Sequence, residues 1–484
     1  MTYLTSMGRA YDSEAGQVYM RAAKLRNRNY TESGRVAMTA VESKERRVLI
    51  VSFHFPPTNI TAAVRLGKFA KYLPQFGWEP TVLTAANVKE LLQTLPVDIE
   101  EANIFRTHYF TLGSMIYYGL TGGQKTIHRT SPKISAWRRI LYKLLRCMAL
   151  VYTLPVVRIL ILEPLGWYRP AVKKGLEIIS KQKIDIIFSS CGPLVSHFVA
   201  ARLHKQSGIP WVAEFRDLWS LNHYVRKVQP LHFLEKELEK EVMKGSDLLV
   251  TVSAPAAKQL EMLHSKNVVV IHNGFDDEDY LHNVPLTTKF TITYTGHIYL
   301  GKQNPTPLLK ALAELKQEDS LSPDELEVRF FGNNVLFAVA PLVKKYRLED
   351  MVKIYGLIPF EESVQKQKES TVLLLLGWND PKERGIYTAK IFEYLGAGNP
   401  VLVIGLKGDI VDELLKETGA GVVVNEVNEI KRLLHQWMQE FRQSGEILSH
   451  FQPDSAAISR YTRKQQAGKL AHVLEQTLRR QETS

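Results

Sequence analysis

Short runs of apolar, mostly β-branched residues alternate with helical stretches along most of the sequence. The first run, Arg47–Phe53, is followed by a helical pattern over Ala62–Phe76, which Gly77 ends, and by a second run at Pro80–Thr84. Continuous apolar runs of this length are typical of parallel strands buried on both faces. Strands that alternate with helices predict an α/β fold with parallel sheets.

The alternation forms two series. The first continues with the runs Ile184–Ser189, Trp211–Phe215, Asp247–Val252 and Asn267–Ile271. The second consists of Phe290–Thr295, Leu326–Phe331, Val352–Tyr355, Thr371–Leu376, Pro400–Ile404 and Gly421–Val424. A chain of 484 residues also exceeds what one hydrophobic core usually supports. We therefore expect two doubly wound domains joined near Asp277–Thr288, with ligands at the carboxyl ends of their strands.

The domain boundaries follow from these two series. Residues 1–45 show no sustained period and few large apolar residues, so we expect a mobile N-terminal extension there. Residues 46–276 are predicted to form the first domain, with a basic insertion at about 110–165. Residues 289–455 are predicted to form the second domain, and residues 456–484 a C-terminal helix.

Composition points to a globular protein of a reducing compartment. The chain is 45% hydrophobic and 23% charged, as ordinary globular proteins are. Its two cysteines, Cys147 and Cys191, are too few for a disulfide framework. The first 20 residues are mixed and polar and lack the apolar core of a signal peptide. We therefore expect a cytoplasmic protein.

The positive charge of the chain is concentrated in one segment. In the whole chain 62 basic residues face 50 acidic ones, a formal net charge of +12. From Ala102 to Leu162 there is no Asp or Glu. Nine basic residues stand in that stretch: Arg106, Lys125, Arg129, Lys133, Arg138, Arg139, Lys143, Arg146 and Arg158. A charge this local favours a polyanionic partner surface.

Part of this segment has the pattern of a basic amphipathic helix. Its apolar positions are Trp137, Ile140, Leu141, Leu144, Leu145 and Met148, and its basic ones Arg138, Arg139, Lys143 and Arg146. Such a helix can lie in a membrane interface. We expect contact with an anionic membrane surface through about residues 125–160; a core helix with a solvated face is the alternative. The uncharged run Cys147–Val157 is too short to span a bilayer. Few stacking aromatic residues interleave the charges, so no nucleic-acid partner is expected.

Polar residues follow several strands of the first domain. The first strand ends in Phe-His-Phe-Pro-Pro, with no Gly-x-Gly-x-x-Gly pattern, which argues against a domain for NAD or FAD. Arg216 and Asp217 come just past the strand Trp211–Phe215, where α/β proteins build their sites. His197 follows the strand before it. A structural Arg–Asp pair is the alternative reading.

The second domain carries two patterns suited to a diphosphate. After its first strand come Gly296 and Lys302, where a glycine lets the backbone approach a phosphate and a lysine supplies charge. Further on, Gly385 precedes a helical pattern that contains Lys390 and Glu393. Residues three apart share a helix face, so the lysine can neutralise phosphate while the carboxylate accepts two ribose hydroxyls. A surface ion pair is the alternative.

Five motifs together resemble the family 4 glycosyltransferases. In chain order they are Phe-Pro-Pro, Phe-Arg-Asp-Leu-Trp, Asn-Gly-Phe-Asp, Thr-Gly-His-Ile-Tyr and Lys-Ile-Phe-Glu-Tyr-Leu-Gly-Ala-Gly-Asn-Pro. The resemblance spans roughly Arg47 to Gln476. It implies the GT-B fold, in which two Rossmann-like domains face one cleft, and a retaining transfer from a nucleotide sugar. It also implies that the helical stretch Tyr461–Leu478 crosses back onto the first domain.

The resemblance assigns roles to matching positions. It implies that Lys302 holds the donor diphosphate, with the expected helix start at Gly385, Ile386 and Tyr387, and that Glu393 binds the ribose. On the acceptor side it places Arg216 and Asp217, with His197 beside them. No metal or other cofactor is expected, since lysines and helix dipoles neutralise the leaving diphosphate in this fold. The acidic run Asp276–Asp279 is therefore not read as a metal site.

The sequence also departs from the family pattern. Gly385 stands where the family has the first of two glutamates, with Glu383 two residues away. His297 replaces an arginine, and Thr61-Ala62-Ala63 replaces a glycine pair. We expect a glycosyltransferase that acts on a glycan or lipid-linked acceptor at the inner membrane face, in cell-surface polysaccharide or glycolipid synthesis. A sugar-nucleotide epimerase or hydrolase, and a catalytically silent scaffold of a polysaccharide-assembly complex, are the alternatives.

Overall fold

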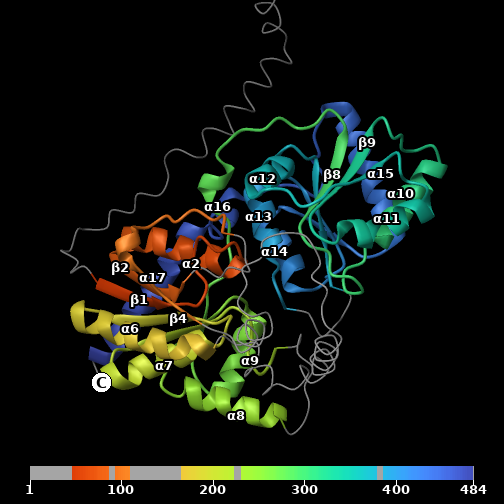
Figure 1. The fold of residues 1–484 in the computed structure, drawn as a ribbon. Helices are drawn as coiled ribbons and strands as arrows, with labels where there is room; N and C mark the ends of the chain where they lie inside the picture. The colour runs from red at the N-terminus through yellow and green to blue at the C-terminus, as the bar shows by residue number, and fades with distance from the viewer. Residues whose placement is uncertain (1–45, 87–92, 110–164, 223–230, 379–384, 483–484) are drawn as a thin grey trace, which may run out of the picture. The chain divides into compact units, whose positions relative to one another are not determined.

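The computed structural model contains two parallel sheets, each covered by helices on both faces (Figure 1). It describes residues 46–86, 93–109, 165–222, 231–378 and 385–482, which all belong to one compact unit, Glu45–Ser484. The expected N-terminal extension, the greater part of the basic insertion and the membrane-binding stretch 125–160 lie outside the described residues. Cys147 and Glu383 do so as well.

The first sheet has seven strands in the order β3-β2-β1-β4-β5-β6-β7. These are β1 Arg46–Val51, β2 Trp78–Ala85, β3 Ile104–Thr107, β4 Ile186–Ser190, β5 Trp211–Phe215, β6 Leu248–Thr251 and β7 Val268–Val270. Its helices are α2 Thr61–Tyr72, α6 Tyr168–Lys181, α7 Val195–Ser207, α8 Leu231–Met243 and α9 Ala254–His264. Short 3-10 turns are η1 Leu73–Phe76, η2 Glu101–Asn103 and η4 Leu165–Trp167.

An apolar core lies on each face of this sheet. Helices α6 and α7 cover one face, where Trp167, Ile178 and Trp211 are buried. Helix α2 packs on the other face beside α17 (Arg463–Glu482), the last helix of the chain. The terminal helix therefore returns to the first domain, as the resemblance implied.

The second sheet has six strands in the order β10-β9-β8-β11-β12-β13. These are β8 Phe290–Thr295, β9 Leu326–Phe331, β10 Val352–Ile354, β11 Val372–Leu376, β12 Val401–Ile404 and β13 Gly421–Val424. Its helices are α10 Thr306–Gln317, α11 Val335–Tyr346, α12 Phe360–Lys368, α13 Ala389–Ala397, α14 Ile410–Thr418, α15 Val427–Ser444 and α16 Ser455–Ser459. Helices α10, α11 and α15 pack on one face, and α13 and α14 on the other.

Both sheets have the strand order of a doubly wound fold, as the alternation predicts. The chain order reverses between β1 and β4 in the first sheet and between β8 and β11 in the second. Ligands of such sheets bind at the carboxyl ends of the strands beside the reversal. The loops after β1, β4, β8 and β11 are therefore the first places to look for a site.

The chain passes between the two sheets through η5 (Asp277–Tyr280) and the segment after it. Phe275 and Tyr280 pack against α13 of the second sheet, together with Tyr461 from the return segment. Backbone hydrogen bonds from Phe275 N to Tyr461 O (3.2 Å) and from Arg463 N to Phe275 O (2.7 Å) join the outgoing and returning chains. We call Phe275, Tyr280, Tyr461 and Arg463 the joint.

Helices of membrane-spanning length and hydrophobicity are absent from the residues that the structure describes.

Candidate functional site

Arg216 is held at the carboxyl edge of the first sheet by neutral oxygen atoms. Its Nε donates to Ser190 Oγ (3.2 Å), and its Nη2 donates to the carbonyl oxygens of Cys191 (2.6 Å) and Gly192 (3.2 Å). A Cβ on Gly192 would lie 2.5 Å from this Nη2, so glycine makes room for the guanidinium. Asp217 is exposed and does not pair with Arg216. The two side chains are therefore not the structural ion pair that was the alternative.

His197 lies in the core rather than at the edge of the sheet. It is fully buried, its Nδ1 is 2.8 Å from Ser189 Oγ, and its ring packs on Phe215. Burial and, next, the charge of Arg216 lower the pKa of His197 to about 3, so the ring is neutral at physiological pH. The expected role of His197 beside the acceptor stays a prediction, for a side chain that is fully buried.

His54 is a histidine of this edge that the sequence reading passed over. It follows β1 directly, and its buried Nδ1 has no hydrogen-bond partner among the described residues. Burial and the charge of Arg216 lower the pKa of His54 to about 4. Its position at the strand reversal, after β1, was the signal that could have found it.

Lys390 crosses a glycine turn at the carboxyl edge of the second sheet. A Cβ on Gly296, whose φ is +119°, would lie 2.3 Å from Lys390 Cε and 3.1 Å from its Nζ. The backbone of Gly332, after β9, also packs against Gly296, because a Cβ on Gly332 would lie 2.1 Å from Gly296 O. Burial lowers the pKa of Lys390, and Glu393 opposes that effect. Gly296 and Lys390, some 90 residues apart in the chain, are thus one structural unit.

Lys302 lies beside the end of β11. Its Nζ is 4.5 Å from the centre of the Trp378 ring, a cation–π contact. The turn that carries Lys302 is fixed by Gln303, whose Nε2 donates to Leu376 O (2.8 Å). Both lysines predicted for the donor therefore stand at the loops on either side of the strand reversal, after β8 and β11.

Glu393 lies one turn after Lys390 on α13 and is partly buried. Burial raises its pKa, whereas the charges of Lys390, on the same helix, and of Arg463, on α17, act to lower it.

The loop before α13 differs from the expectation. The helix begins at Ala389 with Thr388 as its N-cap, not at Gly385, Ile386 and Tyr387. Gly385 N donates to Asp409 Oδ1 (2.8 Å), and Gly385 O accepts from Ser253 Oγ (3.0 Å). A Cβ on Gly385 would lie 2.7 Å from Pro255, so this glycine serves a contact with the first domain. Tyr387 packs edge-on to His272. Ile386 is half-buried.

The acidic run Asp276–Asp279 fastens the joint to α2. Asp276 accepts from Tyr72 Oη (2.6 Å) and pairs with Lys68 (2.7 Å), and Glu278 pairs with Lys71 (2.7 Å). Two of the four acidic residues, Asp276 and Glu278, thus form ion pairs with lysines of α2.

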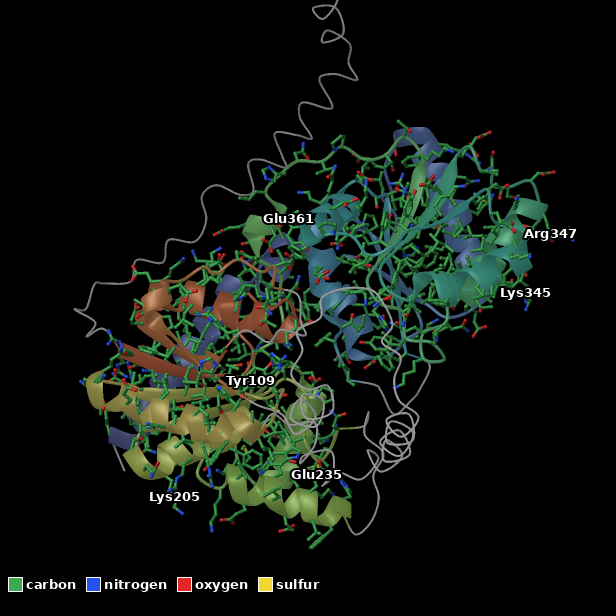
Figure 2. All side chains as sticks on the ribbon, viewed as in Figure 1. Tyr109, Lys205, Glu235, Lys345, Arg347 and Glu361 are labelled. Carbon is green, nitrogen blue, oxygen red and sulfur yellow. The ribbon has the colours of Figure 1, made fainter. Side chains whose placement is uncertain are left out.

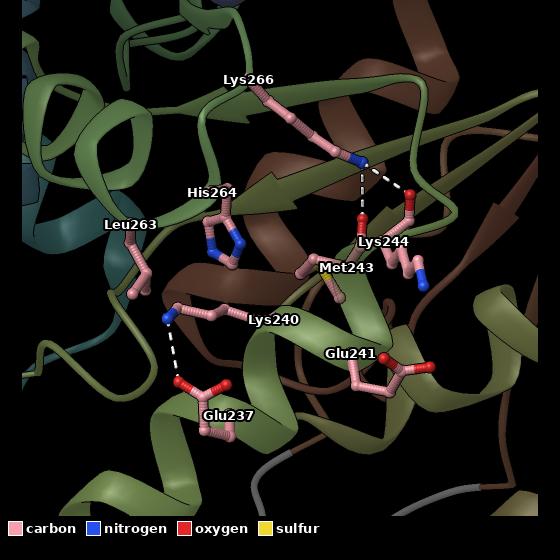
Figure 3. Close-up of a pocket in the computed structure, with 8 residues that line it drawn as sticks. All are labelled: Glu237, Lys240, Glu241, Met243, Lys244, Leu263, His264 and Lys266. Atoms are coloured by element: carbon pink, nitrogen blue, oxygen red, sulfur yellow. Dashed lines mark hydrogen bonds and ion pairs between the residues drawn. The ribbon is translucent and has the colours of Figure 1, made fainter.

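A surface hollow between α8 and α9 is a different kind of feature (Figure 3). Lys266 points into the end of α8, where its Nζ donates to the carbonyl oxygens of Met243 (2.7 Å) and Lys244 (2.9 Å). His264 pairs with buried Glu239 (3.1 Å). The polar groups here cap a helix and contact a buried carboxylate.

Comparison with known proteins bears on the family and the fold. Residues 62–279 match the family model described as Glycosyltransferase Family 4. A search of curated proteins finds no match. A glycosyltransferase from Rickettsia africae ESF-5 superposes with a TM-score of 0.54 at 14% identity, over 90% of this chain and 99% of that one.

Two further solved structures share the fold over most of their length. The HepE protein of Anabaena in complex with UDP-glucose has a TM-score of 0.51 at 15% identity, over 89% of this chain and 99% of that one. A sucrose-phosphate synthase from Thermosynechococcus elongatus has a TM-score of 0.50 at 13% identity, over 90% and 98%. The shared architecture is that of two Rossmann-like domains, the GT-B fold.

Proposed function

We propose that this chain, whose residues 62–279 match the Glycosyltransferase Family 4 model and whose fold is GT-B, transfers a sugar, with retention, from a nucleoside diphosphate sugar to a glycan or lipid-linked acceptor. The observation that carries the donor assignment is Lys390 lying across Gly296, with Glu393 one turn further along the same helix. The diphosphate would lie between Lys390 and Lys302, and the ribose hydroxyls would face Glu393.

This arrangement suits the departure of a nucleoside diphosphate. The bond between the anomeric carbon and the diphosphate oxygen breaks, a bond to the acceptor hydroxyl oxygen forms, and the hydroxyl proton passes to the departing diphosphate. Negative charge grows on the diphosphate, so fixed positive charges beside it lower the barrier. Lys302 and Lys390 supply those charges, and the proposal needs no metal ion. Arg216 and Asp217, at the edge of the first sheet, are assigned to the acceptor side.

The membrane part of the proposal rests on the sequence alone. The basic segment through about residues 125–160 would hold the protein at the inner face of the cell membrane, where a lipid-linked acceptor is found. This places the reaction in cell-surface polysaccharide or glycolipid synthesis.

A binding screen tests the donor assignment first. Thermal unfolding is measured with UDP-glucose, GDP-glucose and ADP-glucose, because a ligand at a hundred times its Kd stabilises the folded state by about 2.7 kcal/mol. Glu393→Ala should then weaken the best donor by about 1.5–3 kcal/mol, the usual cost of losing a hydrogen bond to a charged group. Glu361→Ala is the matched control, since Glu361 is exposed on α12 (Figure 2).

The outcomes separate the alternatives. Unchanged donor affinity in folded Glu393→Ala contradicts the donor site. No binding of any nucleotide sugar favours the silent scaffold. Release of free sugar from the donor without an acceptor indicates a hydrolase, and an altered sugar on the nucleotide indicates an epimerase.

A further inference from the structure

Arg65, on α2, is an arginine whose charge and donors are all used within the first domain. A guanidinium carries five N–H groups. Nε and Nη2 donate to Glu214 Oε1 (3.0 and 2.8 Å), and Nη2 also donates to Ile271 O (2.8 Å). Nη1 donates to His272 O (2.6 Å) and to Asn273 Oδ1 (3.3 Å). Since Arg65 is also fully buried, it has nothing left to offer a ligand.

Arg216 is joined to this ion pair by a chain of hydrogen bonds, but two of its donors are not used. Ser190 Oγ donates its one proton to Glu214 Oε2 (2.6 Å), so toward Arg216 Nε (3.2 Å) it can only accept. Nη2 uses both of its N–H groups on Cys191 O (2.6 Å) and Gly192 O (3.2 Å). The two N–H groups of Nη1 have no acceptor among the described residues. The guanidinium is thus held by three bonds while Nη1 can still donate.

The positive charge of Arg216 also lacks a counter-charge. Glu214, the carboxylate in this chain of bonds, already pairs with Arg65 (2.8 Å). Within the part of the chain that the structure describes, no acid forms an ion pair with Arg216. The rings of His54 and His197 add no charge at physiological pH, because burial and Arg216 lower their pKa values to about 4 and about 3. One unneutralised positive charge therefore remains.

This charge stands where a substrate of the first domain is expected. Ser190 ends β4, Arg216 follows β5, and the chain order of the sheet reverses between β1 and β4. Ligands of doubly wound sheets bind at the carboxyl ends of the strands beside such a reversal. A guanidinium that is already held in place suits the oxygen atoms of a phosphate or carboxylate, since little side-chain freedom is lost on binding.

We propose that Arg216 binds an oxyanion of the acceptor, a phosphate or carboxylate group, and that Ser190, fixed by Glu214, holds the guanidinium in position. The proposal rests on the proposed function and narrows its acceptor to anionic molecules. A lipid phosphate, a sugar phosphate and a uronic acid all carry this chemistry.

The test compares probes that differ chiefly in the anionic group. Farnesyl phosphate is set against farnesol, and glucose 6-phosphate and glucuronic acid are set against glucose. Because the proposed donor site would also bind phosphate, it is first saturated with UDP, GDP or ADP, whichever stabilises the wild-type protein most. Calorimetry should show one anion binding about tenfold to a hundredfold more tightly than its neutral counterpart, the usual effect of a charge-assisted hydrogen bond. The preferred anion then identifies its source.

Two variants remove the guanidinium from its place. Arg216→Met should abolish the preference for the anion and leave the Kd of the nucleoside diphosphate unchanged. Gly192→Ala keeps every charge, but its Cβ would lie 2.5 Å from Arg216 Nη2 and displace that group, so it serves as well if Arg216→Met does not fold. The matched controls are Arg202→Met, at an exposed arginine of α7, and Gly208→Ala, where φ is +72° and a Cβ would meet nothing within 4 Å. Both controls should bind the anion as the wild type does.

Ser190→Ala tests the positioning role. It removes the acceptor of Arg216 Nε, so its affinity for the anion should lie between that of the wild type and that of Arg216→Met. The control is Ser189→Ala, which removes an equally buried hydroxyl of β4 that contacts His197 and Trp211 instead. Wild-type affinity for the anion in folded Ser190→Ala would overturn the positioning role.

The failures of the two proposals are distinguishable. This proposal is overturned if the wild type prefers none of the anions, or if folded Arg216→Met binds the preferred anion as tightly as the wild type does. Absence of nucleoside diphosphate binding in the wild type refutes instead the donor assignment of the proposed function, and the anions are then compared without nucleotide.

Discussion

Replacing Gly296 by alanine should displace the Lys390 side chain from the turn at Gly296. A non-glycine residue at φ +119° costs on the order of 1–3 kcal/mol of stability. The new methyl group would also lie 2.3 Å from Lys390 Cε, closer than any contact allows, so the lysine must leave its place. The loss of one charge-assisted bond to the diphosphate costs about 1.5–3 kcal/mol, which weakens binding by about tenfold to a hundredfold.

Gly301 provides the control within the same turn. Its φ is +75°, so Gly301→Ala suffers backbone strain, yet a Cβ there would meet nothing within 4 Å. Calorimetry with a nucleoside diphosphate should show a large loss for Gly296→Ala and little for Gly301→Ala. Equal affinity in both folded variants would refute the contact between Lys390 and the diphosphate. An equal loss in both would assign the effect to the turn backbone instead.

Three further outcomes follow from other parts of the chain. Arg65→Met should lower the free energy of unfolding by about 3–5 kcal/mol, because Glu214, whose Oε1 lies 2.8 Å from Arg65 Nη2, would stay buried without its ion-pair partner. The double variant with Glu214→Leu should recover part of this stability, and no recovery would contradict the ion-pair explanation. Lys302→Ala should weaken nucleoside diphosphates and leave the free nucleoside unaffected, whereas an equal loss for both would mean that Lys302 does not act on phosphate. Reversing Arg138, Arg139, Lys143 and Arg146 to Glu should abolish co-sedimentation with anionic liposomes and leave donor affinity intact, since each basic residue contributes roughly 1 kcal/mol to such binding. The charge-matched control reverses exposed Lys344 together with exposed Lys205, Lys345 and Arg347, which Figure 2 labels; unchanged binding after the first set of reversals would make the basic segment structural.

The strands β5, β8, β11 and β12 were predictable because every residue in them is buried, which favours a mostly apolar run. The bounds of β5, β8, β9 and β13 agree with the runs read from the sequence. The strand β3 was missed. It has four residues, pairs only with β2 at the edge of the sheet, and reads Ile-Phe-Arg-Thr, which carries too little apolar pattern to stand out.

The site could be predicted in its residue types but not in its contacts. Lys302, Lys390 and Glu393 were found because they follow strands or share a helix face. The contact between Gly296 and Lys390 was not found, because the two residues lie some 90 residues apart in the chain. The burial of His197 could not be predicted, because a histidine in the first turn of a helix looks alike in sequence whether its face meets solvent or the core.

The contacts of Gly385 indicate where the diphosphate can lie. The N–H of Gly385 is already donated to Asp409, and that carboxylate, 5% exposed, also accepts from Ile410 N (2.7 Å) at the start of α14. An anion held in this loop would repel a phosphate, so the loop is unsuited to the role that the helix start was expected to fill. The first turn of α13 is one turn further along, has no side-chain cap, and carries Lys390 toward Gly296. Positive charge and an uncapped helix start therefore coincide at Gly296 rather than at Gly385, which is why the proposed diphosphate position is placed there.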